Sequence, residues 1–262
     1  MKEEWLDYKN IDVVYNTKKA LKNFNLRLYT GENTVIIGPN GSGKSTFIRT
    51  ITKLKYPIYK KDSYIKFYGS RNNNIWDLRS KISFVLTDLD ERIQNDITID
   101  DMILSGSQST FGIIDKAKLT NKDLILLEEI KSKFDLYNIE KYYCDLSDGQ
   151  KRKVLIARSI FNKPKVLLLD EPTCRLDLKS HFELLKLLND LCAKDLTLVY
   201  VTHRVENIIK NVQRVILFKD GAVYADGKPE EVINSESISL LYNYPLNVKY
   251  DNRYWIVSPK LS

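Results

Sequence analysis

The sequence predicts an α/β protein built on a parallel sheet, and three observations carry this prediction. First, the apolar run "TVIIG" leads into a glycine-rich turn and then into an amphipathic helical pattern. Second, the apolar runs "KVLLLD" and "LTLVYVTH" flank the helical segment "SHFELLKLLNDLC", which is the alternation of a βαβ unit with buried strands. Third, a mainly helical stretch separates this unit from the strand-rich start of the chain.

Length and composition indicate a folded protein of enzyme size. The chain has 262 residues, of which 43% are hydrophobic and 29% charged, as in globular domains. No apolar run approaches the roughly 18 residues needed to cross a bilayer, and the N-terminus lacks the apolar core of a signal peptide. Cys144, Cys174 and Cys192 show no CxxC spacing, which indicates reduced thiols. We expect a cytoplasmic protein.

The formal net charge of +7 allows a nucleic acid, a lipid surface or a nucleotide as partner. Lysine, asparagine, isoleucine and tyrosine are abundant throughout, and no basic block is longer than "QKRK" and its neighbours. The simpler interpretation is a compositional bias that leaves lysines in solvent. The net charge therefore does not distinguish between these three kinds of partner.

The first elements follow from their apolar spacing. "IDVVY", "FNLRLY" and "TVIIG" alternate like strands and are separated by polar turn residues. A helix is expected from Lys44 to about Leu54, because Phe47, Ile48, Ile51 and Leu54 recur at helical spacing.

A mainly helical insertion is expected from about Asp88 to Asp145. Thr98 and Asp101 have the spacing of a capping box, and "NKDLILLEEIKSKFDLYNI" carries apolar residues at helical intervals. The helical insertion is therefore expected to precede the βαβ unit along the chain.

The end of the chain continues with turn and strand signals. A hairpin is expected through Asp220-Gly221, and a helix with Pro229 near its start. The tail at 235–262 contains "KYDNRYWIV" and is expected to add a strand packed on the same domain; a partner-docking strand is the alternative. We assign the tail no chemistry.

Residues 38–45, Gly-Pro-Asn-Gly-Ser-Gly-Lys-Ser, satisfy the pattern GxxxxGK[ST] of a phosphate-binding loop. Glycines let consecutive backbone N–H groups point at phosphate oxygens, and the helix N-terminus adds its positive end. Lys44 would reach the β- and γ-phosphates, and Ser45 would ligate Mg²⁺. An ordinary glycine turn is the alternative, but it does not account for the strand before and the helix behind.

Two carboxylates end the strand "VLLLDE", and a histidine ends the strand "LTLVYVTH". Asp170 is placed to hold the water shell of the metal, and Glu171 to polarise the attacking water. Acids here could instead cap the next turn. If the two strands are neighbours, His203 lies beside the γ-phosphate, where it could bond an oxygen or orient water. His181 lies in a helix and is interpreted as structural.

A second helix opening follows far downstream of the phosphate loop. Leu146 to Gln150 read Leu-Ser-Asp-Gly-Gln, and such a segment can open a helix and leave backbone N–H groups unpaired. This kind of helix end attracts anions. The chain thus has a second candidate anion site, and its own residues do not say whose phosphate it serves.

Taken in order, "GPNGSGKST", "LSDGQ", "VLLLDEPT", "CRLD" and "TH" resemble the nucleotide-binding domain of the ATP-binding cassette (ABC) superfamily. The resemblance runs from about Ile11 to Ile233. It implies a P-loop NTPase fold with a RecA-like parallel-sheet core, an antiparallel β subdomain and a helical insertion. The chain would form a single domain over 1–262, with a helical subdomain at approximately 88–160 and a short C-terminal extension at 235–262.

The resemblance also implies how ATP and Mg²⁺ are bound. In this family two cassettes dimerise head to tail, so each ATP lies between the phosphate loop of one copy and the signature segment, here Leu146–Gln150, of the other. Catalysis would fall on Glu171, His203 and Lys44, and the metal on Ser45 and Asp170. The nucleotide-binding residues would be Tyr15, which stacks on adenine; Gly38, Pro39, Asn40, Gly41, Ser42, Gly43, Lys44, Ser45 and Thr46 of the loop; Ser147, Gly149 and Gln150, which serve the partner's ATP; and Asp177, in the loop that signals across the dimer.

This sequence departs from the family pattern at two places. The third residue of the signature is Asp148 instead of glycine, and we expect its carboxylate to turn to solvent and cap its own helix, because triphosphate would repel it. The strand "KISFVL" should lead into a glutamine that contacts Mg²⁺ and couples ATP to a membrane partner. Thr87 follows instead, and Asp90 or Gln94 are the other candidates for that role.

The function favoured is Mg²⁺-dependent ATP hydrolysis by a cassette dimer that energises separately encoded membrane-spanning transporter subunits, so that the protein would lie at the inner face of the membrane. The second reading is a soluble ABC ATPase without a transporter, similar to those of iron-sulfur assembly or of nucleic-acid and ribosome work. A direct nucleic-acid partner is not expected. A phosphate-loop kinase would leave Ser147 to Gln150 without a role.

Overall fold

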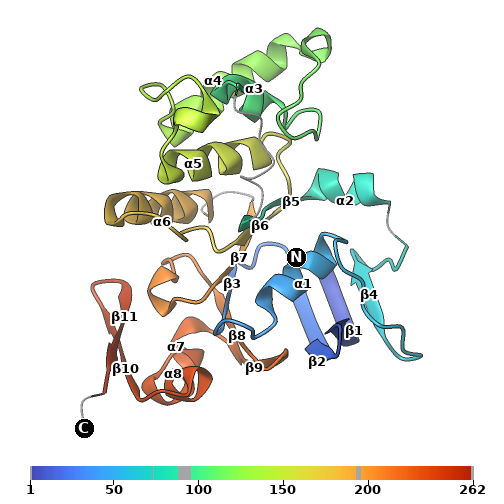
Figure 1. Cartoon of the computed structure of the whole chain (residues 1–262), viewed down its shortest axis with the longest axis vertical. Coiled ribbons are helices and arrows are strands. Elements are labelled where there is room, and N and C mark those ends of the chain that lie inside the picture. Colours follow the sequence, from blue (N-terminus) through green and yellow to red (C-terminus); the bar gives the residue numbers. More distant parts are fainter. Residues whose placement is uncertain (1, 73, 88–95, 193–195, 261–262) are drawn as a thin grey trace.

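The computed structural model describes residues 2–72, 74–87, 96–192 and 196–260. Figure 1 shows a central sheet with the helical part of the chain at one end and an antiparallel sheet beside it. The strands of the central sheet are β3 (Thr34–Ile37), β5 (Ile82–Val85), β6 (Val166–Asp170), β7 (Thr197–Thr202), β8 (Arg214–Lys219) and β9 (Ala222–Gly227). Their order is β5-β6-β7-β3-β8-β9, and all neighbours are parallel except β8 and β9. The predicted parallel sheet is confirmed.

Side chains of the central strands alternate between two hydrophobic cores. Val35 and Ile37 of β3 pack into one core, and Ile36 packs into the other. Because both faces of the sheet are covered, its central strands read as continuous apolar runs. The helices α1 (Lys44–Ile51), α2 (Ile75–Lys81) and α6 (Leu178–Cys192) contribute to these cores.

The antiparallel sheet consists of β1 (Glu4–Tyr15), β2 (Lys18–Tyr29) and β4 (Tyr64–Phe67), in the order β2-β1-β4. An aromatic cluster joins this sheet to the central one. The ring of Phe24 lies 5.6 Å from that of Phe47 in α1 and 5.0 Å from that of Phe218 in β8. These contacts fix the helix that follows the phosphate loop against both sheets.

Helix α1 is shorter than the sequence predicted. Lys53 has a φ of 57°, and the N–H groups of Leu54 and Lys55 both turn back to the carbonyl of Arg49. The helix therefore ends at Ile51, and Leu54, expected on its buried face, is 59% exposed.

The predicted helical insertion is confirmed within the described residues, and Figure 1 shows it at one end of the molecule. Thr98 caps the first helix by accepting the N–H of Asp101 at 3.1 Å. Thr120 and Asp123 form a reciprocal capping box at the next helix. The elements are α3 (Ile99–Leu104), η2 (Lys116–Lys118), α4 (Asn121–Phe134), η3 (Tyr143–Asp145) and α5 (Asp148–Ser159).

The C-terminal part holds one difference from the sequence-based expectation. The β8–β9 hairpin turns through Asp220 and Gly221, both at positive φ, as predicted. The tail adds two strands instead of one, and they pair with each other rather than with the central sheet. The hairpin still packs on the same domain, since β11 contacts η4. The remaining elements are η4 (Val205–Asn207), α7 (Pro229–Val232), α8 (Ser235–Tyr242), β10 (Leu246–Asp251) and β11 (Tyr254–Pro259).

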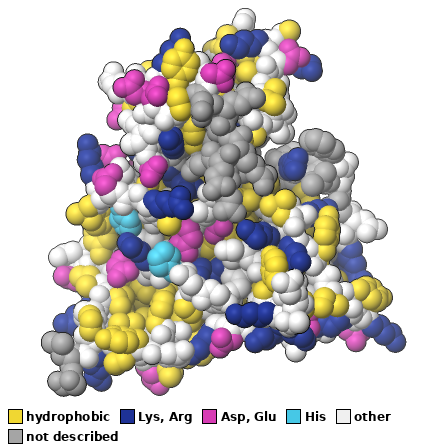
Figure 2. All heavy atoms as spheres, viewed as in Figure 1, with side chains coloured by type: hydrophobic (Ala, Val, Ile, Leu, Met, Phe, Trp, Pro, Cys, Tyr) yellow, Lys and Arg dark blue, Asp and Glu magenta, His cyan; other side chains and the backbone are white. Residues whose placement is uncertain are grey.

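The surface gives no single block of one charge on the face that Figure 2 shows. Lysine and arginine side chains are spread over it with acidic ones between them, while hydrophobic side chains gather over the C-terminal elements. This distribution fits the interpretation of the net charge as a compositional bias. In the described ranges, no helix is both long and apolar enough to span a bilayer.

Candidate functional site: a phosphate loop beside a carboxylate–histidine pair

The phosphate loop runs from the end of β3 to the start of α1 and needs its glycines. A Cβ atom at Gly38 would lie 2.4 Å from the carbonyl oxygen of Phe218 and 2.6 Å from the hydroxyl of Ser42. Gly43 has a φ of 106°, and a Cβ there would lie 2.7 Å from the carbonyl of Ala20. The backbone can therefore curl tightly enough to surround an anion.

Lys44 lies inside this loop. Its Nζ donates to the carbonyls of Gly38 at 2.7 Å and Pro39 at 3.0 Å. Burial lowers the pKa of Lys44, while the nearby carboxylates of Glu171 and Asp170 act in the opposite direction. A buried ammonium that donates to two backbone carbonyls is well placed to exchange them for phosphate oxygens.

A cavity of about 360 Å³ opens over the loop and suits a triphosphate. It is lined by Tyr15 and Lys18 at one side, Lys44 and Ser45 along the loop, and Glu171. The hydroxyl of Ser42, within the loop, is buried and has no hydrogen-bond partner among the described residues. The cradle and this hydroxyl fit the bound phosphates that the sequence predicts.

The donor set for a metal also fits. Ser45 and Asp170 offer a hydroxyl and a carboxylate, the oxygen donors that Mg²⁺ prefers. Where the structure describes the chain, it contains no cluster of three or more His, Cys, Asp and Glu side chains that could hold a metal. This is expected for Mg²⁺ at a nucleotide site, since phosphate oxygens and water supply its other ligands.

Glu171 and His203 meet where β6 and β7 end. Because these strands are parallel neighbours, the residues after them lie at the same edge of the sheet. The imidazole Nδ1 of His203 lies 3.0 Å from Oε2 of Glu171, and their side chains are 39% and 17% exposed. The structure thus brings together the predicted base and histidine, and adds a direct contact between them that the sequence did not show.

Glu171 is held in an unusual backbone conformation. Its φ is 44°, and its N–H donates to the carbonyl of Val201 at 3.0 Å. Positive φ is uncommon for a non-glycine residue without a short polar side chain such as Asn or Asp, and at Glu171 it comes with this backbone bond to the neighbouring strand.

Two further residues contact the site: Tyr242, which sequence reasoning did not select, and Thr87, one of the three candidates for the coupling position. The hydroxyl of Tyr242, in α8, donates to the carbonyl of His203 at 2.6 Å. Thr87 donates to the carbonyl of Asp170 at 3.3 Å and so lies at the end of the metal-binding strand. Tyr242 belongs to the tail that we had assigned no chemistry, and nothing local distinguishes it among 16 tyrosines. Asp90 and Gln94, the other candidates for the coupling role, lie outside the described residues.

The signature segment starts helix α5 with a reciprocal capping box. The hydroxyl of Ser147 accepts the N–H of Gln150 at 3.3 Å, and the side chain of Gln150 accepts the N–H of Ser147 at 2.9 Å. Asp148 is exposed, as expected, but Ser147 and not Asp148 caps the helix. No signature residue is among those lining the cavity over the phosphate loop in the described part of the chain. Within one chain, therefore, the two anion sites are separate.

Gly149 of the signature packs against Ser180, which is hydrogen-bonded to Asp177. A Cβ at Gly149 would lie 2.6 Å from the Cβ of Ser180 in α6. Ser180 in turn donates to Asp177 through its hydroxyl at 2.7 Å and its N–H at 3.1 Å, and these bonds lower the pKa of Asp177. The predicted signature and the predicted signalling loop are thus in contact through one serine.

Tyr15 lies at the edge of the cavity over the phosphate loop, where it could stack on a base. The ammonium of Lys55 lies 4.4 Å from the centre of the Tyr15 ring. Lys55 lines an adjoining cavity of about 390 Å³ but not the one over the loop. Tyr15 thus lies between the cavity over the loop and the one that contains Lys55.

Tyr15→Ala is expected to weaken ATP binding by about tenfold to a hundredfold, because stacking on an aromatic ring contributes about 1–3 kcal/mol per base. Isothermal titration calorimetry would measure it. Binding of inorganic tripolyphosphate should be unchanged, and Tyr15→Phe should bind ATP normally. Equal losses for ATP and tripolyphosphate would contradict a stacking role.

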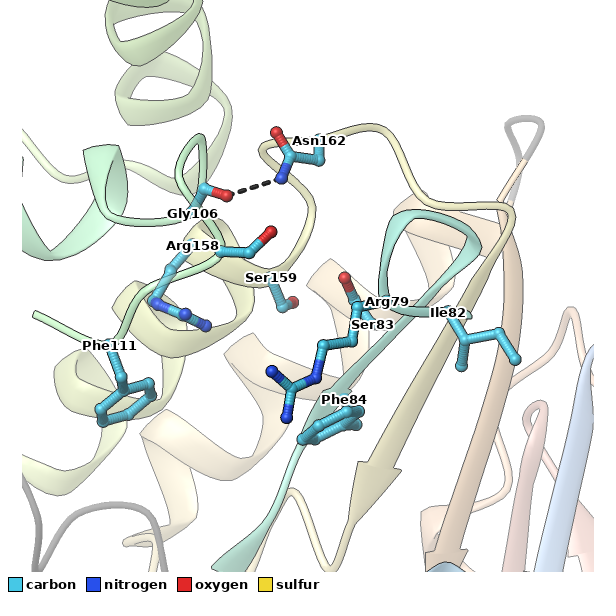
Figure 3. A pocket seen from close by; sticks show the side chains of 10 residues that line it. Arg79, Ile82, Ser83, Phe84, Gly106, Phe111, Arg158, Ser159 and Asn162 are labelled. Carbon is cyan, nitrogen blue, oxygen red and sulfur yellow. Dashed lines mark hydrogen bonds between the residues drawn. The ribbon is translucent and has the colours of Figure 1, made fainter. Parts of the chain in front are cut away.

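A second cavity, of about 310 Å³, lies between β5 and the helical part. Figure 3 shows the guanidinium groups of Arg79 and Arg158 turned into this space from opposite sides, with Phe84 and Phe111 at its floor and edge. Arg158 donates to the hydroxyl of Ser105 at 3.1 Å and to the carbonyl of Thr110, and burial lowers its pKa to about 10. Two arginines and no carboxylate are among the described residues that line the cavity.

Comparison with known proteins identifies the family of this fold and site. The family model described as "ABC transporter" matches residues 21–174. An uncharacterised ABC transporter ATP-binding protein of Methanocaldococcus jannaschii is 33% identical over 243 residues, which cover 91% of this chain and 81% of that protein.

Solved structures give the same answer. A solved structure described as an inward-facing conformation of a "putative metal-chelate type ABC transporter" matches with a TM-score of 0.78 and 25% identity, over 99% of this chain and 98% of that one. A dimeric ATP-binding cassette in a post-hydrolysis state, bound to ADP and Pi, matches with a TM-score of 0.69 and 28% identity, over 86% and 98%.

Proposed function

The chain belongs to the ABC transporter family and is an ATP hydrolase, and from this premise we propose that it is the ATP-binding subunit that energises a membrane transporter with separate membrane-spanning subunits. The relatives' own description as ABC transporter ATP-binding proteins supports this reading. The protein would then work in the cytoplasm, at the inner face of the membrane, where its membrane partner holds it.

The contact between Glu171 and His203 is the observation that carries the hydrolytic mechanism. The carboxylate lines the cavity over the phosphate loop and accepts a hydrogen bond from the imidazole, 3.0 Å away. A carboxylate so placed can orient a water molecule and accept its proton, while His203 holds the carboxylate in position through Nδ1. Bonding a γ-phosphate oxygen as well requires a proton on the other ring nitrogen of His203, Nε2. The site thus has a base and a group that orients the base.

Lys44 supplies charge stabilisation. When ATP enters, the ammonium can leave the carbonyls of Gly38 and Pro39 for the β- and γ-phosphate oxygens, where negative charge develops during hydrolysis. Ser45 and Asp170 would hold Mg²⁺, which neutralises phosphate charge when bound.

We infer a head-to-tail homodimer from the separation of the two anion sites. Ser147, Gly149 and Gln150 do not line the chain's own cavity over the loop, so a second copy is the economical source of a signature for it. A dimeric cassette among the similar solved structures supports this arrangement.

We propose that the membrane partner docks at the cavity lined by Arg79 and Arg158. It borders β5, the strand that leads into Thr87, where the family places its coupling residue. A partner helix that inserts an acidic side chain here would contact Arg79 and Arg158 and would touch both the sheet and the helical part (Figure 3).

Gentle purification from native membranes and from the soluble fraction tests the proposal. Recovery of a polytopic membrane subunit is expected, and Arg79→Glu should lower that recovery by about tenfold, because a like charge would oppose the acidic partner group. ATP binding should stay unchanged. Lys210→Glu, at an exposed lysine of another cavity, is the matched control and should leave recovery intact. Recovery of soluble partners alone would contradict the transporter assignment.

The second candidate function is a soluble ABC ATPase without a transporter, similar to those of iron-sulfur assembly or of nucleic-acid and ribosome work. Thr87 favours it, because the position after "KISFVL" lacks the glutamine that couples ATP to a membrane partner. The same purification distinguishes the two functions.

A further inference from the structure

A buried asparagine connects the two segments that carry Glu171 and His203. Asn207, at the end of η4, is 1% exposed. Its side-chain amide lies 2.8 Å from the hydroxyl of Thr173, two residues after Glu171, and 2.8 Å from the hydroxyl of Thr202, directly before His203. Either orientation of the amide can bridge the two threonines, because a hydroxyl donates as well as accepts.

The backbone of Asn207 is itself fixed to strand β7. The hydroxyl of Tyr200, a fully buried residue of that strand, donates to the carbonyl of Asn207 at 2.8 Å and accepts the N–H of Ile209 at 3.2 Å. The backbone that carries this amide is therefore hydrogen-bonded to a buried side chain of β7. A bridge of this kind holds the ends of β6 and β7 at a set separation.

If the bridge had only a structural role, it would lower the stability of the fold. Val205, Ile208 and Ile209 around Asn207 are buried and apolar, and its Oδ1 has no hydrogen-bond partner in the described part of the chain. A buried polar atom without a partner lowers stability, and an apolar side chain of similar volume would avoid this loss. A role of the bridge in positioning Glu171 and His203 would explain why a polar side chain occupies this apolar region.

The Glu171–His203 contact needs such support. Both side chains are partly exposed, and an ion pair or hydrogen bond in contact with water contributes little by itself. The positive φ of Glu171 must also be imposed by its surroundings.

We propose that Asn207 is a positioning residue for hydrolysis: by tying Thr173 to Thr202, it holds the Glu171 carboxylate and the His203 imidazole in hydrogen-bond contact. This inference rests on the proposed function of Glu171. It assigns Asn207 no contact with ATP, so nucleotide binding does not depend on it.

Asn207→Leu tests the proposal, because leucine keeps the volume and removes the bridge. We expect kcat to fall by about tenfold to a hundredfold, since small displacements of a catalytic group have effects of this size, while the Kd for ATP stays within about twofold. Thr173→Val, which is nearly isosteric and removes one of the two bridged hydroxyls, should lower kcat in the same direction. It provides a second measurement if Asn207→Leu folds poorly.

Asn33→Leu is the matched control. Asn33 is also a buried asparagine that joins segments of the fold, since it accepts the N–H of Leu198 at 2.9 Å and donates to the carbonyl of Asn211 at 3.2 Å. It lies before β3, at the opposite end of the sheet from the site. Asn33→Leu should lower the melting temperature and leave kcat per folded molecule unchanged.

A spectroscopic measurement makes the test independent of turnover. The chain has two histidines, so ¹⁵N-labelled imidazole signals report His203 with His181 as internal reference. The signature of a carboxylate bond at Nδ1 of His203 should weaken in Asn207→Leu and Thr173→Val and persist in Asn33→Leu. A folded Asn207→Leu variant with wild-type kcat and an unchanged His203 signal would overturn the inference. If Glu171→Gln turns over like the wild type, the proposed role of Glu171 as base fails instead, while the imidazole signals still report whether Asn207 holds the pair.

Discussion

Replacing Glu171 with glutamine is expected to slow ATP hydrolysis by about a hundredfold to ten-thousandfold, the usual contribution of a positioned general base. Glutamine keeps the length and most hydrogen bonds of the side chain but cannot accept a proton from water. ATP binding should remain, because Lys44 and the glycine cradle are untouched. The variant should therefore accumulate an ATP-bound dimer, visible by size-exclusion chromatography with ATP.

Glu206→Gln provides the control for this experiment. Glu206 is an exposed carboxylate three residues after His203, in the same region of the fold, and it does not line the cavity over the loop. Its neutralisation should leave turnover and dimerisation as in the wild type. Unchanged turnover of Glu171→Gln would remove Glu171 from the role of base.

Mixing two inactive variants should restore activity if each site is composed of two chains. Lys44→Ala disables the phosphate loop, and Ser147→Arg disables the signature by placing a bulky side chain at the cap of α5. In a head-to-tail heterodimer one site combines both defects, while the other combines an intact loop with an intact signature. Random assortment predicts recovery of about a quarter of the wild-type rate, because half of the dimers then hold one intact site.

The control mixture combines Lys44→Ala with the double variant Lys44→Ala/Ser147→Arg. No dimer in this mixture has an intact phosphate loop, so no activity should return. Native mass spectrometry would show that heterodimers form in both mixtures. Heterodimers of the two single variants without any recovered hydrolysis would contradict the composite site.

Much of the fold could be predicted because parallel sheets leave a clear pattern in sequence. Strands β6 and β7 are buried on both faces, so they read as the continuous apolar runs "VLLLD" and "TLVYVT". Their pairing as neighbours then followed from the right-handed βαβ connection, and it placed Glu171 and His203 at one edge.

The end of α1 could not be predicted from periodicity alone. Leu54 fits the helical spacing, but the left-handed conformation of Lys53 ends the helix first. The hairpin in the tail could not be predicted for a related reason. "KYDNRYWIV" has the composition of a single strand, but Asn252 and Arg253 adopt positive φ, and the segment folds back on itself as a hairpin.

The supporting contacts of the site could not be predicted because they are set by three-dimensional packing. Tyr242 reaches His203 from a helix that follows two further strands, and Asn207 bridges two threonines far apart in the chain. Such side chains carry no motif. Their roles emerge only where the backbone brings polar groups together in an apolar region.

The tight fit of Gly149 against Ser180 limits how the helical part can move. The start of α5 has no space for a single additional carbon against α6, and Lys153 and Glu183 form an ion pair at 2.8 Å one turn further along, so the two helices are in close contact at both places. In the proposed dimer, a shift of the Asp177 segment would therefore reach Ser147, the residue proposed to contact the ATP of the other copy. In such a dimer, hydrolysis of the ATP at one site would therefore shift α5 and α6 of the copy whose signature contacts that ATP.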